Sequence, residues 1–115
     1  MVHVTKEGIL LEKTAHDFES HGVLNPAVIR EGNTVHLFYR AVKAENHSTI
    51  GYCALDGPHE VANRATEPVI FPEFDYESVG VEDPRICKID GLYYLTYTAY
   101  DGVNALGALA TSTDL

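Results

Sequence analysis

Two prolines, Pro26 and Pro84, each follow a polar residue, and these two polar residues are the first candidates for chemistry. The polar residues are Asn25 and Asp83, and both dipeptides come directly before a run with strand character. Because proline fixes its own φ and favours extended backbone in the residue before it, we expect both side chains to be held rigidly at a strand entrance. Rigidly held amide and carboxylate groups suit the recognition of sugar hydroxyls. Taken singly, each dipeptide is better explained as a turn former, but their recurrence at the same point of both repeats favours a site.

A second carboxylate, Glu82, stands beside Asp83 in an otherwise apolar stretch. Since neighbouring residues on a strand face opposite sides, we expect Glu82 to face away if Asp83 faces the site. Arg85 is expected to pair with one of these two carboxylates. One carboxylate would then be catalytic and the other structural, which makes Glu82 and Arg85 candidate supporting residues.

Arg40 interrupts an apolar strand-like run, and the corresponding position later in the chain is Thr98. A charged group at the end of a buried strand has to be paired or functional. Its planar donor fork could bind a sugar hydroxyl or a phosphate. The alternative is an ion pair with Asp83 or Glu82, and the two interpretations are compatible.

Other site chemistries have no support in the residue pattern. The six histidines show no spacing typical of metal ligands, and no Cys-x-x-Cys pair occurs, so we expect no metal site. Cys53 and Cys87 are expected to be reduced and buried. Neither a glycine-rich phosphate loop nor a Gly-x-Ser-x-Gly nucleophile elbow is present.

The elements that position these residues follow from an internal repeat. Residues 22–29 (GVLNPAVI) recur 58 residues later as residues 80–87 (GVEDPRIC). The same offset carries Leu37, Tyr39 and Ala41 onto Leu95, Tyr97 and Ala99. In the third strand-like run the offset becomes 56, so we expect the preceding loop to be two residues shorter in the second copy.

Each copy predicts three consecutive short strands separated by turn residues. We expect strands at residues 26–30, 35–42 and 48–55, a short outer strand at 67–72, and strands at 85–89, 92–100 and 106–111. Repeated units of this kind are typical of a β-propeller. The prediction is an all-β chain of about two blades of a five-bladed propeller, forming one domain, 1–115, with repeats at about 22–57 and 80–115. A β-sandwich is the alternative, although it does not require the same pattern in successive units.

Composition excludes several kinds of partner. The chain has 115 residues and a net charge of −9, which argues against a nucleic-acid binder that neutralises phosphates. The same acidity argues against binding to a membrane surface, and no apolar run approaches the roughly 20 residues of a spanning helix. Because residues 1–8 also lack a long apolar stretch, we expect a cytoplasmic protein.

Five sequence blocks together resemble glycoside hydrolase family 130, whose best-known members are β-mannoside phosphorylases, with some β-mannosidases. In order, the blocks are GVLNPA (22–27), LFYRA (37–41), GVEDPRI (80–86), YLTYTA (94–99) and ATSTDL (110–115). The resemblance implies a five-bladed β-propeller and an inverting reaction with no cofactor, in which inorganic phosphate is the co-substrate and a β-mannoside oligosaccharide is the substrate. It also implies that Asp83 is the general acid, acting by way of a mannose hydroxyl, and that Asn25 and Arg40 hold the mannose.

The length of the chain leaves alternatives open. Family members are as long as five blades require, so we expect this chain to need the rest of the propeller, or homo-oligomer formation, for activity. One alternative is a catalytically incompetent module that self-associates or binds carbohydrate. Another is a propeller hydrolase of the invertase or arabinanase kind, which ranks lower because Asn25 stands where such an enzyme would place an acid.

Overall fold

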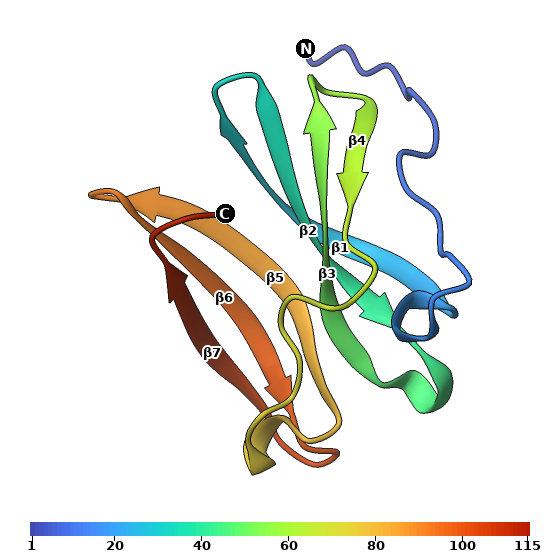
Figure 1. The fold of residues 1–115 in the computed structure, drawn as a ribbon, viewed down its shortest axis with the longest axis vertical. Coiled ribbons are helices and arrows are strands. Elements are labelled where there is room, and N and C mark those ends of the chain that lie inside the picture. The colour runs from blue at the N-terminus through green and yellow to red at the C-terminus, as the bar shows by residue number, and fades with distance from the viewer.

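Seven β-strands in two units make up most of the chain, and the computed structural model describes all residues, 1–115 (Figure 1). The first unit holds four strands: β1 (Gly22–Glu31), β2 (Thr34–Val42), β3 (Ser48–Asp56) and β4 (Glu60–Arg64). The second holds three: β5 (Gly80–Ile89), β6 (Leu92–Tyr100) and β7 (Ala105–Ser112). The three helical segments are single 3₁₀ turns, η1 (Asp17–Glu19), η2 (Ala44–Asn46) and η3 (Asp75–Glu77), and none has the length or apolar character to cross a membrane. The predicted all-β class is confirmed.

Within each unit, neighbouring strands pair antiparallel in chain order. The fourth strand of the first unit is β4, whereas the outer strand expected at residues 67–72 is wrong. That segment contributes one isolated bridge, between Ile50 and Ile70. Its two prolines lack the N–H groups that a continuous ladder needs.

The register of β7, the third strand of the second unit, differs by one residue from the register that the sequence repeat predicted. Tyr39 pairs with Gly51, while the corresponding Tyr97 pairs with Ala108 and not with Gly107. The loop between β2 and β3 spans residues 43–47, and the loop between β6 and β7 spans residues 101–104. The loop of the second unit is therefore one residue shorter, not two. The sequence repeat aligns β3 with β7 by their small residues, and that alignment is wrong by one residue. Such a shift moves every side chain of a strand to the opposite face of the sheet.

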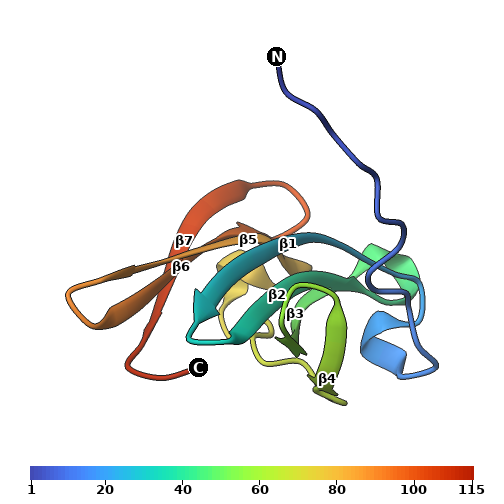
Figure 2. The same ribbon diagram turned by 90° about the horizontal axis from the view of Figure 1, so that it is seen from above.

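The two units meet through one backbone pairing and an apolar interface. The pairing is a single parallel bridge between Ser48 of β3 and Gly80 of β5. In Figure 2 the two groups of strands lie beside each other, with β1 next to β5. The buried cluster between them, here called the second core cluster, draws on both units: Ala27, Phe38, Ile50, Val81 and Leu95.

A first core cluster covers the opposite face of the first unit: Phe18, Leu37, Tyr39, Ala41, Cys53 and Leu55. Leu11, which precedes the first strand, packs against it and extends the cover. Cys53 is buried here as expected, but Cys87 is exposed, which corrects the expectation of two buried thiols; both cysteines are free. Cys87 lies on β5 of the second unit, whose strands are less covered.

A buried glutamate on a 3₁₀ turn precedes the first strand of each unit. Glu19 of η1 and Glu77 of η3 are 0% and 2% exposed, and they lie 58 residues apart, as do their partners. Tyr39 donates to Glu19 (2.7 Å) and Tyr97 donates to Glu77 (3.0 Å). The repeat therefore extends upstream to DFES (17–20) and DYES (75–78), a signal that the strand patterns alone do not show.

Candidate functional site

Asn25 and Asp83 lie on matching β-bulges inside the first strand of each unit. The pairing of β1 with β2 shifts between Leu24 and Ala27, and that of β5 with β6 shifts between Glu82 and Arg85. The residue before each proline is not extended: φ is 48° at Asn25 and 50° at Asp83, in the left-handed region. Asparagine and aspartate tolerate this region better than other side chains. The expected extended backbone at a strand entrance is thus wrong, because the bulge sets the local conformation.

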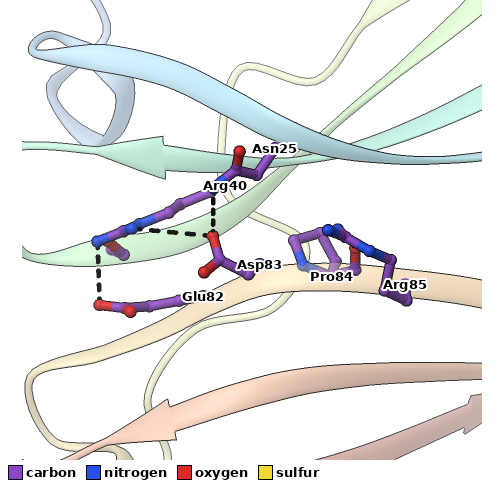
Figure 3. A network of polar contacts seen from close by, with 7 residues as sticks. Asn25, Arg40, Glu82, Asp83, Pro84 and Arg85 are labelled. Carbon is purple, nitrogen blue, oxygen red and sulfur yellow. Dashed lines mark hydrogen bonds and ion pairs between the residues drawn. The ribbon is translucent and has the colours of Figure 1, made fainter.

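The two bulges bring the corresponding residues of the two repeats into contact. Asn25 Nδ2 donates to Asp83 Oδ1 at 2.7 Å, across a separation of 58 residues (Figure 3). The equivalent residues of the two repeats, Asn25 and Asp83, are therefore hydrogen-bonded to each other. Bulges commonly re-aim a side chain at a functional site, and a left-handed residue before proline carries strain that the surrounding structure must offset.

Arg40 of β2 faces both carboxylates. Its Nη2 donates to Glu82 Oε1 at 3.1 Å, and its Nη1 lies 3.8 Å from Asp83 Oδ1 (Figure 3). The predicted ion pair is confirmed with both partners, whereas the expectation that Glu82 faces away is wrong. The bulge interrupts the alternation of side chains between residues 82 and 85, which lets two neighbours face the same group.

Arg85 does not join this group. Its Nη1 donates to the backbone oxygen of Pro84 at 2.7 Å, so its side chain folds back over Pro84 and contacts neither carboxylate (Figure 3). The expected pairing of Arg85 with Glu82 or Asp83 is therefore wrong. Arg85 follows the bulge, where β5 resumes its regular register with Thr96 of β6.

Ser48, the first residue of β3, is a member of the site that sequence reasoning missed. Its Oγ accepts a hydrogen bond from Arg40 Nε at 2.8 Å, and the residue is 1% exposed. A serine at the start of a strand carries no sequence signal of its own. The contact arises because β2 and β3 form a hairpin in which Val42 pairs with Ser48.

The two carboxylates differ in exposure. The side chains of Arg40 and Glu82 are each 15% exposed, while that of Asp83 is 39% exposed. Both contacts to Asp83 use Oδ1, so Oδ2 takes part in neither. The arrangement offers one open carboxylate able to exchange a proton with a ligand, beside an amide and a guanidinium that can orient it. No group of three or more His, Cys, Asp or Glu side chains is placed to hold a metal ion.

Comparison with known proteins gives consistent matches. The model of glycoside hydrolase family 130, described as beta-1,4-mannooligosaccharide phosphorylase, matches residues 6–115. The chain is similar to a beta-1,2-mannobiose phosphorylase of Thermoanaerobacter sp. (strain X514), with 37% identity over 89% of this chain and 38% of that protein. It is similar also to a 1,2-beta-oligomannan phosphorylase of the same organism, with 37% identity over 80% of this chain and 33% of that protein.

A solved structure gives the same result. The fold superposes on a glycosyl hydrolase from Bacteroides ovatus with a TM-score of 0.85 and 25% identity, over 91% of this chain and 36% of that chain. The chain thus spans less than two fifths of the length of these relatives. Since the family model covers almost every residue, including Asn25, Arg40 and Asp83, the chain belongs to glycoside hydrolase family 130.

Proposed function

We propose that residues 1–115 form about two blades of a five-bladed β-propeller that phosphorolyses β-mannosides with inversion, and that Asp83 is its general acid. The observation that carries this proposal is the meeting of Asn25, Arg40 and Asp83 at one point between the two repeats. The stacking of the two units across the second core cluster supports the propeller, because neighbouring blades pack face to face in the same way.

In the proposed reaction, Asn25 and Arg40 hold the mannose while Asp83 supplies a proton to the glycosidic oxygen by way of a mannose hydroxyl. Phosphate attacks the anomeric carbon from the opposite face, the bond to the glycosidic oxygen breaks, and mannose 1-phosphate forms with inverted configuration. Hydrolysis with inversion would require a second carboxylate as base. Glu82 is mostly buried and paired with Arg40, so only one of the two adjacent carboxylates is open.

The acidity of the chain bears on the phosphate. A net charge of −9 and a single arginine at the site are a poor phosphate-binding environment. The remaining basic residues of a phosphate site would therefore come from the other blades. On this proposal the complete protein consists of these 115 residues together with those blades, and the reaction uses no cofactor.

The experiment measures mannose 1-phosphate formed by the complete protein from β-mannobiose, with and without phosphate. We expect phosphate-dependent product, and we expect Asp83→Asn to lower the rate by about 10²- to 10⁴-fold, because a general acid contributes that much. Asp90→Asn is the matched control, since Asp90 also has a positive φ, 50°, but lies in the β5–β6 turn. Free mannose formed without phosphate would overturn phosphorolysis, and an unaffected Asp83→Asn variant would overturn the acid.

A second candidate, a self-associating module, is favoured by one observation. Strand β7 is at the edge of the sheet and exposes Leu106 and Leu109. Exposed apolar edge strands pair readily with other chains. Light scattering on the 115-residue chain tests this candidate: a stable oligomer supports the module, and a monomer counts against it.

A further inference from the structure

The guanidinium of Arg40 is held by two groups from different units. On one side, Ser48 Oγ of β3 accepts from Nε at 2.8 Å. On the other, Glu82 Oε1 of β5 accepts from Nη2 at 3.1 Å. A guanidinium is a rigid planar fork with five N–H donors, so fixing two of its nitrogens fixes the plane and the direction of the third.

The third nitrogen, Nη1, is the one that faces Asp83. At 3.8 Å from Asp83 Oδ1 it lies beyond hydrogen-bond distance, and it donates to no other group of the chain. Its two N–H donors are therefore free to bind an oxygen of a ligand while its charge remains close to the carboxylate. The direction in which Nη1 points depends on Ser48 and Glu82.

Ser48 sits where the two units join. Its pairing with Gly80 is the only ladder contact between β3 and β5. A Cβ on Gly80 would lie 3.3 Å from Ser48 Cβ and 3.4 Å from Glu82 Oε1, closer than ordinary packing for the first contact. The hydroxyl that holds Arg40 thus belongs to the residue that makes the one backbone bridge between the two units.

From this geometry we infer that Ser48 is a positioning residue for the reaction, acting through Arg40 and not by touching the substrate. The inference rests on the proposed function, in which Arg40 holds the mannose beside Asp83. Without the Ser48 hydroxyl, Arg40 Nε loses its acceptor and only Glu82 still fixes the guanidinium. A displacement of about 1 Å in a group that orients the substrate costs on the order of 100-fold in rate.

The test is a double-mutant cycle in the complete protein, with kcat/KM on β-mannobiose as the readout. We expect Ser48→Ala to lower kcat/KM by about 10- to 100-fold. In an Arg40→Ala background the same change should have no further effect, because Ser48 acts only through Arg40. A purely structural role would give losses that multiply in the double variant, and that result would overturn the inference.

Thr49→Val is the matched control. Thr49 is the next residue after Ser48, and its hydroxyl is buried without a hydrogen-bond partner. Removal of this hydroxyl should therefore leave kcat/KM unchanged. Gly80→Ala is the second variant, in case Ser48→Ala does not fold. It adds a methyl against Ser48 and should lower kcat/KM by a smaller factor, again only when Arg40 is present.

The outcomes separate this inference from the function on which it rests. If Arg40→Ala retains full activity, the proposed role of Arg40 fails and the role of Ser48 fails with it. If Arg40→Ala is severely impaired while Ser48→Ala and Gly80→Ala equal the Thr49→Val control, only the inference about Ser48 fails.

Discussion

The two units share a repeated sequence and a strand order, yet they differ in how well they are covered. In the first unit, β3 has buried residues along most of its length, and the sheet is packed on both faces, by the first and second core clusters. In the second unit, β7 has no buried residue and only one face is packed, by the second core cluster. The repeat thus determines which strands form, whereas the neighbours of a strand determine how deeply it is buried.

The buried glutamates of the two units also differ, in whether a cation balances their charge. Glu19 is paired with Arg64 at 3.2 Å, in addition to its hydrogen bonds from Tyr39 and Thr14. Glu77 accepts from Tyr97 and from the backbone N–H of Glu73, and no cation pairs with it. The same local motif is therefore charge-balanced in the first unit and not in the second.

The largest expected effect on stability comes from removing Arg64, the cation paired with Glu19. Arg64→Ala should lower the free energy of unfolding by about 3–5 kcal/mol, because it leaves the fully buried carboxylate of Glu19 without its partner. Arg85→Ala in the second unit should change it by less than about 0.5 kcal/mol, since Arg85 is exposed. Urea unfolding of both variants checks this. An effect of Arg64→Ala as small as that of Arg85→Ala would mean that Glu19 does not depend on its cation.

Two glycines, one on the third strand of each unit, give the next effect. A Cβ on Gly51 would overlap the ring of Tyr39, whereas a Cβ on Gly107 would meet nothing within 4 Å. Gly51→Ala should therefore destabilise the chain by about 1–3 kcal/mol through overpacking. Gly107→Ala should stay within about 0.5 kcal/mol. If thermal unfolding shows the two variants to be alike, the contrast between β3 and β7 is wrong.

A third effect concerns stability at alkaline pH. Burial, followed by the hydrogen bond to Glu77, raises the pKa of Tyr97 from 10.0 to about 12, and burial with the bond to Glu19 raises the pKa of Tyr39 as well. The folded state holds these protons more tightly than the unfolded state. Stability is therefore fully present below pH 10 and falls as the pH rises toward 12.

Denaturant unfolding across this alkaline range checks the expectation. Tyr97→Phe removes one of the two tyrosines and should flatten the decline while leaving the part due to Tyr39. A decline identical to that of the unmodified chain would show that Tyr97 is not held neutral by its surroundings.

Much of the fold could be predicted from the sequence, because alternation and turn residues report strands directly. The internal repeat at 58 residues also predicted that Asn25 and Asp83 occupy matching positions. The register of β7 could not be predicted reliably, because Gly51 and Gly107 match in type but not in position on the strand.

The geometry of the site was harder to predict than its members. The usual preference of a residue before proline predicted extended backbone at Asn25 and Asp83. The bulges instead impose a left-handed φ, and Glu82 and Asp83 both face Arg40. Ser48 contributes through its place at the junction of the two units, which no local pattern encodes. The buried Glu19 and Glu77 could have been found from the recurring DFES and DYES segments.

The most direct test of the central claim compares two substrates with the Asp83→Asn variant of the complete protein. β-Mannobiose has a poor leaving group that needs protonation, whereas an activated aryl β-mannoside has a leaving group that departs without it. If Asp83 is the general acid, the variant should lose about 10²- to 10⁴-fold on mannobiose and far less on the aryl mannoside. An equal loss on both substrates, or no loss on mannobiose, would contradict the account.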